Sequence, residues 1–349
     1  MRYPKFLEEH GIIGLVAPSF GCAIEPYKSA FENALTKWEE MGYHIHLGPN
    51  CYASSGIGIS NDPKLCAEEL NEWYCSDEND IIISCGGGEL MCEVVPHMDF
   101  ARMKQAEPKW YMGFSDNTNF TFLSTILMDT AAIYGPCAPK FGMDPWHDSI
   151  QDAWDLLCGR TDIVHGYDLW EKEGIKDEEH PLLPYNVTEP VVIKTYVCKA
   201  GISEETTEEV QLEGRLIGGC MDILQMYPGT DYDKVKDFNE KYKEDGFIWF
   251  LESCDLNIMS IRRAIWQFKE AGWFQYLKGF LIGRPLCYGE EAFGIDQYRA
   301  VTDLLAEYNV PIIMDIDLGH LPPMMPIICG GTANISIKKN DISIQYTFK

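Results

Sequence analysis

The stretch YMGFSDNTNF, residues Tyr111–Phe120, decides how the first half of the chain is interpreted. An extended apolar approach, Lys109–Met112, leads into Gly113, and a helix is expected to begin after Asn117. A serine at such a junction, here Ser115, exposes its hydroxyl above free backbone N–H groups that can hold a developing oxyanion. This is the arrangement of a nucleophile elbow, although Asn117 replaces the second glycine of G-x-S-x-G. A plain helix cap is the alternative, and this stretch alone leaves both open.

Short β-rich runs alternate with helical patterns on both sides of this stretch. Strands are expected at Gly11–Pro18, Tyr43–Leu47, Asp80–Cys85, Lys109–Met112 and Ala131–Tyr134, with helices at Glu25–Met41 and Asp62–Trp73. The alternation predicts an α/β fold with an open parallel sheet covered on both faces. Chemistry in such sheets lies beyond the carboxyl ends of the strands, where Ser115 and the run Gly86–Gly88 both fall.

The glycine run after Cys85 has three interpretations. It could cradle a phosphate, but neither G-x-x-x-x-G-K-[ST] nor a full G-x-G-x-x-G is present. It could present a backbone N–H to an oxyanion beside Ser115, because glycine lets the backbone approach closely. It could also be a plain turn between a strand and a helix. Cys85 itself, inside an apolar strand, fits an inert core thiol better than a nucleophile.

The second half of the chain resumes an α/β pattern after a polar interruption. Residues 1–165 are expected to form an N-terminal α/β domain, and 166–209 a linker and loop segment. Residues 210–349 are expected to form a smaller, β-rich C-terminal α/β domain that ends in a β-hairpin. A helix is predicted at Asn257–Ala271, with an apolar inner side.

A serine nucleophile needs a base, and the base needs an orienting acid. His320 lies in a rigid loop flanked by glycine and prolines, beyond the strand Pro311–Met314. Glu252 ends the apolar run FIWFLE. Burying a carboxylate there would cost roughly several kcal/mol unless the charge is paired. A structural histidine and an acid at a helix N-terminus are the alternatives.

Composition limits the partners of the chain. Its 349 residues carry a formal net charge of −26, which repels phosphate backbones and anionic lipid surfaces. We therefore expect no nucleic-acid and no membrane partner. The thirteen cysteines include no C-x-x-C pair and fit reduced thiols, and the first apolar run is too short for a signal peptide. These features predict a cytoplasmic protein. His44 and His46 lack a third ligand nearby, so no metal is expected.

Motifs along nearly the whole chain resemble those of the LD-carboxypeptidase family of serine peptidases (peptidase family S66), including its microcin C immunity (MccF-like) branch. Each motif is weak alone, but their shared order is specific. The matching stretches are GIIGLVAPSF, CGGGELMCEVVPHMDF, MGFSDNT, YGPCAPKFG, GRLIGGCMDIL, PGTDYD, FLESCDLNIMSIRRAIWQFKEAGWF and DLGHLPPMMPIICGG.

The resemblance implies roles for the matching residues. Ser115 would be the nucleophile, His320 the general base and acid, and Glu252 the group that orients the histidine. The resemblance further implies an oxyanion hole of the backbone N–H groups of Asp116 and Gly87, and substrate binding by Gly86, Gly88 and Arg263. It also implies a homodimer with no metal and no cofactor. Departures occur at Asn117, Cys220-Met221 and Tyr134, and they put the identity of the substrate in doubt.

The expected function is that of a serine hydrolase cleaving an amide bond. Its substrate would be a murein tetrapeptide, in cell-wall recycling, or a microcin C-like peptidyl or aminoacyl nucleotide, in antibiotic resistance. The length of the chain, and its long segment 159–209 with Trp170 and Tyr185, favour the second. A catalytically inactive small-molecule binding module on the same fold is the alternative. A thiol enzyme using Cys85 would be inactivated by iodoacetamide, which we do not expect.

Overall fold

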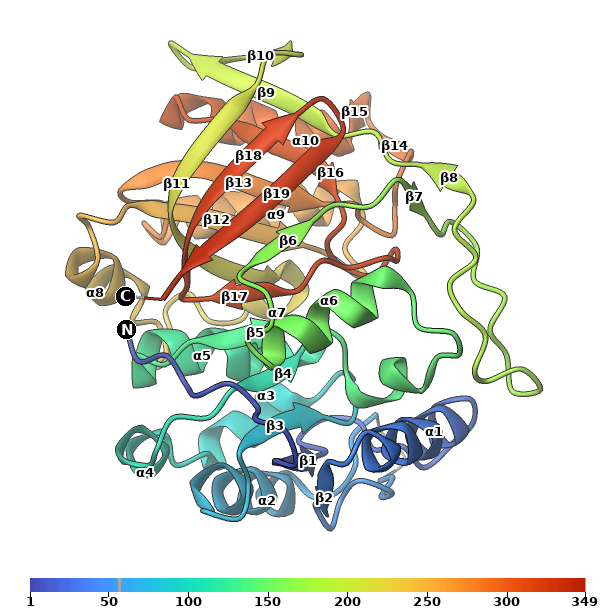
Figure 1. Cartoon of the computed structure of the whole chain (residues 1–349). Coiled ribbons are helices and arrows are strands. Elements are labelled where there is room, and N and C mark those ends of the chain that lie inside the picture. Colours follow the sequence, from blue (N-terminus) through green and yellow to red (C-terminus); the bar gives the residue numbers. More distant parts are fainter. Residues whose placement is uncertain (56–57, 349) are drawn as a thin grey trace. The chain divides into compact units, whose positions relative to one another are not determined.

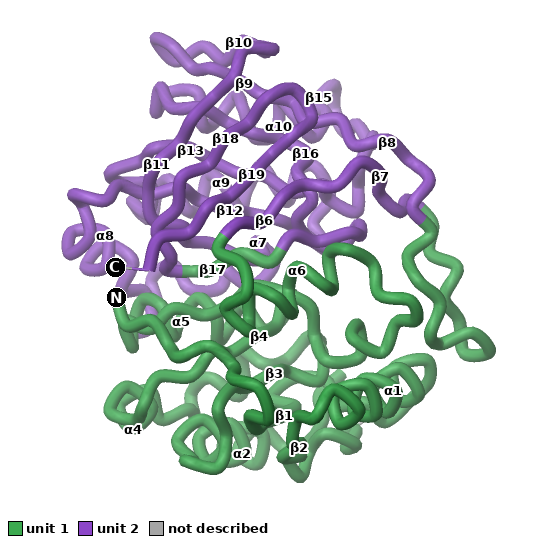
Figure 2. Tube along the Cα trace, in the orientation of Figure 1, with its two compact units in different colours: residues 1–162, 173–186, 326–329 green, residues 163–172, 187–325, 330–349 purple. Residues whose placement is uncertain are grey.

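The computed structural model describes residues 1–55 and 58–348. Two compact units divide the chain, and neither is continuous in sequence (Figure 2). Unit 1 comprises Met1–Asp162, Glu173–Asn186 and Pro326–Cys329, and unit 2 comprises Ile163–Lys172, Val187–Met325 and Gly330–Lys349. The middle of the chain is thus shared between the units, since Glu173–Asn186 belongs to unit 1, whereas Ile163–Lys172 and Val187–Met325 belong to unit 2.

Unit 1 is built on a six-stranded sheet in the order β17-β5-β4-β3-β1-β2 (Figure 1). Five strands pair in parallel, and β17 pairs antiparallel with β5 at one edge. The inner strand β3, IIIS, is buried at every residue, as a parallel strand covered on both faces must be. The bounds are β1 (Ile12–Val16), β2 (His44–Leu47), β3 (Ile81–Ser84), β4 (Tyr111–Gly113), β5 (Ala132–Tyr134) and β17 (Ile327–Cys329).

Helices connect the parallel strands of unit 1. The start of α2 shows why these helices form where they do, because Asp62 caps the Lys64 N–H at 2.9 Å and Pro63 fills the first helical position. The bounds are α1 (Tyr27–Glu40), α2 (Pro63–Cys75), α3 (Met91–Val94), η1 (Val95–His97), α4 (Phe100–Gln105), η2 (Ser115–Asn117), α5 (Thr118–Met128), η3 (Ala138–Gly142) and α6 (Asp148–Leu157).

Unit 2 is built on a nine-stranded mixed sheet in the order β10-β9-β16-β13-β12-β11-β18-β19-β6. Its centre, β11 to β16, is parallel, and antiparallel strands flank it on both sides. The bounds are β6 (Ile163–His165), β9 (Lys194–Lys199), β10 (Ile202–Thr206), β11 (Val210–Cys220), β12 (Phe247–Glu252), β13 (Leu277–Gly283), β16 (Ile312–Ile316), β18 (Thr332–Lys338) and β19 (Asp341–Thr347).

Helices and two small hairpins complete unit 2. The helix α9 begins at a capping side chain, since Asn257 accepts the Ser260 N–H at 3.0 Å. The bounds are α7 (Met221–Leu224), α8 (Val235–Lys241), α9 (Ile258–Glu270), α10 (Gln297–Leu305), η4 (Ala306–Tyr308), β7 (Leu169–Trp170) with β8 (Glu189–Pro190), and β14 (Glu291–Ala292) with β15 (Ile295–Asp296).

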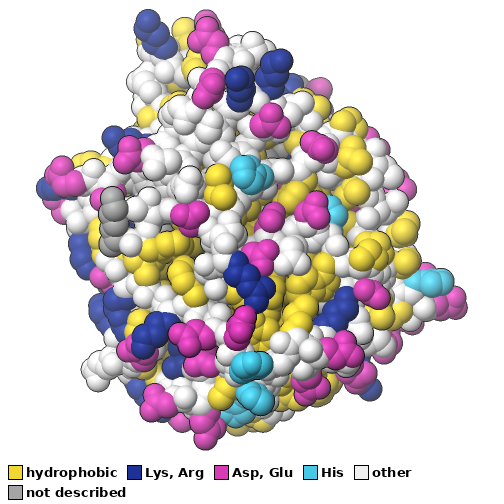
Figure 3. All heavy atoms as spheres, in the orientation of Figure 1, with side chains coloured by type: hydrophobic (Ala, Val, Ile, Leu, Met, Phe, Trp, Pro, Cys, Tyr) yellow, Lys and Arg dark blue, Asp and Glu magenta, His cyan; other side chains and the backbone are white. Residues whose placement is uncertain are grey.

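The observed fold is the predicted α/β arrangement of a parallel sheet followed by a β-rich second unit. All thirteen cysteines are free thiols. None of the described helices combines the length and the apolar content that a membrane span requires. Acidic and basic side chains are interspersed on the face drawn in Figure 3, although acidic residues dominate the chain as a whole.

Candidate active site

Ser115 lies on a sharp turn directly after β4, in unit 1. Its φ is +61°, a left-handed conformation that a serine adopts only when the surrounding structure enforces it. The short helix η2 begins at Ser115 and runs into α5. Gly113 must be a glycine here, because a Cβ would lie 2.7 Å from Cγ of Asn117. The local geometry is that of the nucleophile elbow predicted from the sequence.

The glycine run packs directly against this turn. A Cβ placed on Gly87 would lie 3.2 Å from Cβ of Ser115 and 3.4 Å from its Oγ. Gly88 has a φ of +149°, and a Cβ there would lie 2.3 Å from Oγ of Ser19. The backbone of Gly87 therefore lies so close to the Ser115 side chain that a Cβ would crowd it, whereas Gly88 makes room for Ser19.

Asp116 is completely buried below the turn. Its carboxylate accepts hydrogen bonds from the Ser19 hydroxyl, from the Met91 N–H at 2.9 Å and from Nδ2 of Asn119 at 2.8 Å. Burial raises the pKa of Asp116 to about 6, and the hydrogen bonds from Ser19 and Met91 oppose this effect. The side chain of Asp116 thus links η2 to the loop after β1 and to the start of α3. Its backbone N–H, and not its side chain, is the candidate oxyanion donor.

Asn117 connects the elbow to the glycine run. Its Nδ2 donates to the carbonyl oxygen of Gly86 at 2.8 Å and to that of Phe114 at 3.1 Å. Its Oδ1 accepts from the buried hydroxyl of Tyr111. In the sequence Asn117 stands out only as a departure from two motifs, and this network was not predicted.

Two other predictions in unit 1 concern Tyr134 and Cys85. The hydroxyl of Tyr134 accepts the backbone N–H of Ser115 at 3.0 Å, so this departure from the family pattern contacts the elbow itself.

Cys85 is 1% exposed. Burial is the main cause that raises its pKa well above the usual value, and the neighbouring thiols of Cys22 and Cys51 add to the effect. These surroundings fit the core thiol that we expected.

Glu252 and His320 meet within unit 2. Oε2 of Glu252, the fully buried last residue of β12, lies 2.8 Å from Nδ1 of His320. The His320 side chain is 15% exposed. Burial alone would lower its pKa, but the charge of Glu252 and the imidazole's hydrogen bonds with Cys254 and Glu252 outweigh it and raise the pKa to about 10. This pairing is the acid–histidine relationship that a triad requires.

Two glycines make room for the Glu252 carboxylate. Gly319, with a φ of +105°, would place a Cβ 2.6 Å from Oε2 of Glu252. Gly283, at the end of β13, would place one 3.1 Å from Cβ of Glu252 and 2.1 Å from the carbonyl oxygen of Leu318. The loop that bears His320 can therefore lie against β12 only because both positions lack a side chain.

A buried ion pair anchors the same loop. Asp317, at its start, is 0% exposed and pairs with Arg284, which also donates to the carbonyl oxygen of Asp315 at 2.7 Å. The other carboxylate oxygen of Asp317 accepts the Tyr167 N–H at 2.8 Å. This pair was not predicted, although Arg284 directly after β13 and the two aspartates of the run DID are visible in the sequence.

The sequence-predicted residues thus form two groups. Unit 1 brings together Ser115, Asp116 and the run 86–88. Unit 2 brings together Glu252 and His320. Arg263, predicted to bind substrate, is exposed on the second turn of α9.

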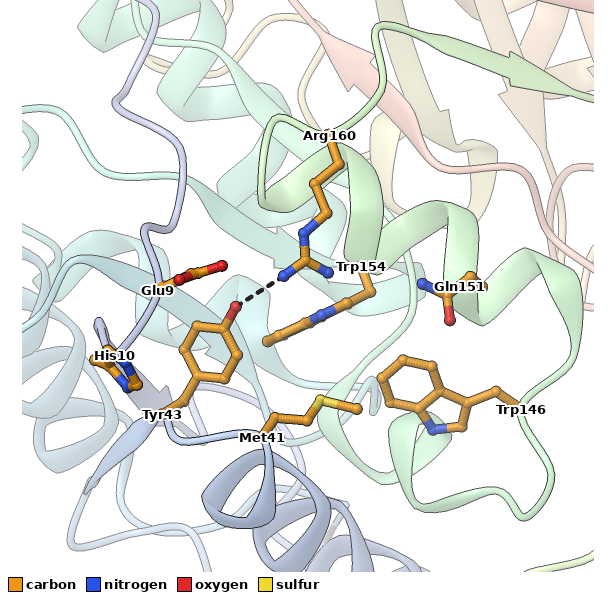
Figure 4. A pocket seen from close by; sticks show the side chains of 8 residues that line it. All are labelled: Glu9, His10, Met41, Tyr43, Trp146, Gln151, Trp154 and Arg160. Atoms are coloured by element: carbon orange, nitrogen blue, oxygen red, sulfur yellow. Dashed lines mark hydrogen bonds between the residues drawn. The ribbon is translucent and has the colours of Figure 1, made fainter.

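A separate cavity of about 510 Å³ lies in unit 1 (Figure 4). Tyr43 and Trp154 are its most buried lining residues, and Nη2 of Arg160 donates to the Tyr43 hydroxyl at 3.2 Å. Glu9 and His10 come just before β1, and Tyr43 just before β2, so the cavity lies at the amino ends of these strands. It contains none of the predicted site residues. Within residues 1–55 and 58–348, no cluster of three or more metal-ligating side chains is present.

Comparison with known proteins assigns the chain to a family. A family model described as the LD-carboxypeptidase N-terminal domain matches residues 13–135, and one described as the LD-carboxypeptidase C-terminal domain matches residues 213–335. The microcin C7 self-immunity protein MccF of Escherichia coli is 25% identical over 286 residues, which cover 80% of this chain and 77% of MccF. The murein tetrapeptide carboxypeptidase of Pseudomonas aeruginosa is 21% identical over 317 residues, covering 89% and 88% of the two chains.

Solved structures share the fold. The structure of MccF in complex with glutamyl sulfamoyl guanosine superimposes with a TM-score of 0.79 at 20% identity, covering 99% of this chain and 98% of that one. At this identity the likeness shows the fold alone. Because the two family models together match more than half of the residues, the chain belongs to the LD-carboxypeptidase family, peptidase family S66.

Proposed function

We propose that this chain is a serine hydrolase that cleaves an amide bond, with Ser115 as nucleophile, His320 as general base and acid, and Glu252 as the orienting carboxylate. The observation that carries the proposal is the 2.8 Å contact between Nδ1 of His320 and the buried Glu252, because it leaves Nε2 as the ring nitrogen for proton transfer. The strained turn at Ser115 supports the nucleophile.

The proposed reaction proceeds through an acyl-enzyme. Nε2 of His320 takes the proton of the Ser115 hydroxyl while Oγ attacks the carbonyl carbon, and the oxyanion is held by the backbone N–H groups of Asp116 and Gly87. The C–N bond then breaks, and His320 gives its proton to the leaving amine. Water, deprotonated by the same imidazole, attacks the ester and releases the acid together with Ser115.

Two substrates remain candidates for this reaction. One relative is a murein tetrapeptide carboxypeptidase, and the other is an immunity protein whose structure holds glutamyl sulfamoyl guanosine. Trp170 and Tyr185, which favoured the nucleotide substrate in the sequence, both pack against protein. Trp170 is 4% exposed and lies under Arg284, whereas Tyr185 lies against His147 and Lys140. These contacts leave the two substrates equally supported.

A substrate panel tests the proposal. Purified protein is incubated with a murein tetrapeptide and with an aminoacyl sulfamoyl nucleoside, whose aminoacyl carbonyl is bonded to nitrogen, and products are identified by mass spectrometry. We expect hydrolysis of an amide bond in one of the two. Ser115→Ala should fold normally and lower turnover by several orders of magnitude, roughly 10³-fold or more. Full turnover by that variant would refute the role of Ser115.

The binding-module alternative predicts a different result. Such a protein would bind one of the two compounds, measured by calorimetry, without releasing any product. Gln151→Ala is a control for either assay, since Gln151 is exposed at the separate cavity of unit 1 and no role in the reaction is proposed for it.

A further inference from the structure

The loop that follows β1, Ala17–Phe20, contacts both residues of the proposed oxyanion hole. Phe20 donates its backbone N–H to the carbonyl oxygen of Gly87 at 2.9 Å. The hydroxyl of Ser19, a residue that is 0% exposed, donates to the carboxylate of Asp116. The loop, the glycine run and the nucleophile turn all belong to unit 1. The position of this loop therefore affects both halves of the proposed oxyanion hole.

One buried carboxylate holds the loop at its start. Glu69, in α2, is 3% exposed, and its Oε2 accepts the backbone N–H of Ala17 at 2.7 Å. Its Oε1 accepts the backbone N–H of Asn50, in the loop after β2, at 2.8 Å. A Cβ on Gly48 would lie 2.2 Å from Oε1, so the second loop can approach the carboxylate only because residue 48 is a glycine. Glu69 thus joins the loops that follow β1 and β2.

An ionised carboxylate is suited to this position. The N–H groups of Ala17 and Asn50 both need an acceptor, because buried backbone donors are almost always paired. A carboxylate accepts at both oxygens and donates at neither, whereas an amide has only one accepting oxygen. Burial raises the pKa of Glu69 to about 7, and the hydrogen bonds from Ala17 and Asn50 oppose this effect. Above that pH the side chain is ionised and can hold both loops.

The connection from Glu69 to the oxyanion hole is short. Pro18 stands between Ala17 and Ser19, and its ring fixes φ, so a shift of Ala17 passes on to Ser19. Ser60 donates to the carbonyl oxygens of both Ala17 and Ser19 and holds the loop from its other side. Glu69 supplies the hydrogen bond that fixes the N–H side of the same loop.

We propose that Glu69 is a positioning residue of the hydrolase, an inference that rests on the function proposed above. Its carboxylate holds Ala17, so that the loop after β1 keeps Asp116 and Gly87 where their N–H groups meet the oxyanion. Glu69 acts through this loop and not on the substrate. Because the oxyanion forms on the way through the transition state, a loosened loop lowers kcat and leaves substrate binding in place.

Glu69→Gln removes this hold while keeping the size of the side chain. The amide nitrogen carries hydrogens and cannot accept, so the N–H of either Ala17 or Asn50 is left facing a donor. Glu68→Gln is the matched control. Glu68 is the exposed neighbour of Glu69 on the same helix, and its replacement removes the same charge.

Amide hydrogen exchange, followed by NMR on the full chain at pH 8, tests the hold on the loop without any substrate. The reference amide is that of Ile82, which donates to the carbonyl oxygen of Trp110 at 2.8 Å within the sheet. In Glu69→Gln we expect exchange at Phe20 to accelerate at least about tenfold more than exchange at Ile82. Glu68→Gln should change neither rate. Equal acceleration of both amides, as a loss of global stability produces, or no acceleration at Phe20 would overturn the proposal.

Turnover of the substrate that the native protein hydrolyses provides the second readout. Per folded protein, Glu69→Gln should lower kcat at least about tenfold and leave KM within about twofold, whereas Glu68→Gln should keep both values. An unchanged kcat in the folded Glu69→Gln protein would overturn the positioning role. A native protein without turnover would instead refute the proposed function, and the exchange rates would still decide whether Glu69 holds the loop.

Discussion

Asn117 donates from its side-chain amide to the carbonyl oxygen of Gly86, 2.8 Å away, and so joins the nucleophile turn to the glycine run. The same side chain accepts from the buried Tyr111 hydroxyl. Asn117 therefore holds the loop after β3 and the loop after β4 at a fixed distance from each other. These two loops hold the serine and the proposed oxyanion donors.

Replacing Asn117 should damage both stability and catalysis. In Asn117→Ala the buried Tyr111 hydroxyl loses its bond to Oδ1 of Asn117 and keeps only the one with Ser84, so we expect a loss of about 1 kcal/mol in the free energy of unfolding. We also expect kcat to fall, because the glycine run is no longer held against Ser115. Denaturant unfolding and steady-state kinetics measure the two effects.

Tyr111→Phe separates these effects. It removes the hydroxyl but keeps the bond between Asn117 and Gly86, so it should destabilise the protein while leaving kcat close to that of the native protein. If both variants lost catalysis equally, the link between Asn117 and Gly86 would not be what positions the glycine run.

Gly319→Ala should disable the histidine loop. Its Cβ would lie 2.6 Å from Oε2 of Glu252 in a backbone of φ +105°, so the loop must shift. A displacement of about 1 Å at a catalytic group costs roughly 100-fold in rate, which is the loss we expect in kcat/KM. Gly201→Ala is the control, because φ is +77° there but nothing lies within 4 Å. Equal activity of the two variants would show that a Cβ pressed against Glu252 does not disable the histidine loop.

Asp116 should make stability fall as pH rises. The ordinary pKa of 3.8 is raised to about 6 in the folded protein, so the unfolded chain loses this proton at a lower pH than the folded chain does. Between these values the folded state binds more protons, and the free energy of unfolding drops by roughly 3 kcal/mol. Asp116→Asn should remove that decrease in chemical denaturation at pH 4 and 7. A difference between the two proteins that does not change with pH would contradict the raised pKa.

His320 should set the acidic limb of the pH–rate profile. The imidazole acts as a base only when it is neutral, so kcat/KM should rise with pH through a pKa raised towards about 10. Cys254 is one cause of that rise, and Cys254→Ser should move the limb to lower pH. The Glu252 contact stays in this variant. A limb that stays in place, or moves to higher pH, would show that the thiol does not act on the imidazole.

Periodicity predicted the regular elements well because the local sequence determines them. The strand expected at Asp80–Cys85 is β3 (Ile81–Ser84), and the helix expected at Asn257–Ala271 is α9 (Ile258–Glu270). The edge strand β17 could not be predicted, because its partner β5 lies almost 200 residues earlier and no local pattern records such a pairing. The strand β10 was not predicted, because its charged side chains interrupt the apolar pattern of a buried strand. An edge strand tolerates such side chains.

The site was predicted in part. Glu252 at the end of an apolar strand and His320 on a glycine-flanked loop were visible, and the structure pairs them. The polar network of Ser19, Asp116 and Asn117 was missed because it depends on three loops meeting. The homodimer, the substrate-binding role of Arg263 and the choice of substrate stay predictions.

Active-site labelling tests the central claim most directly. A fluorophosphonate probe bonds covalently to a serine only when that serine is activated by a base, and peptide mass spectrometry locates the adduct. We predict one adduct, on Ser115, which is lost in Ser115→Ala and strongly reduced in folded His320→Asn. An adduct on another serine, or labelling of Ser115 that does not need His320, would contradict the account.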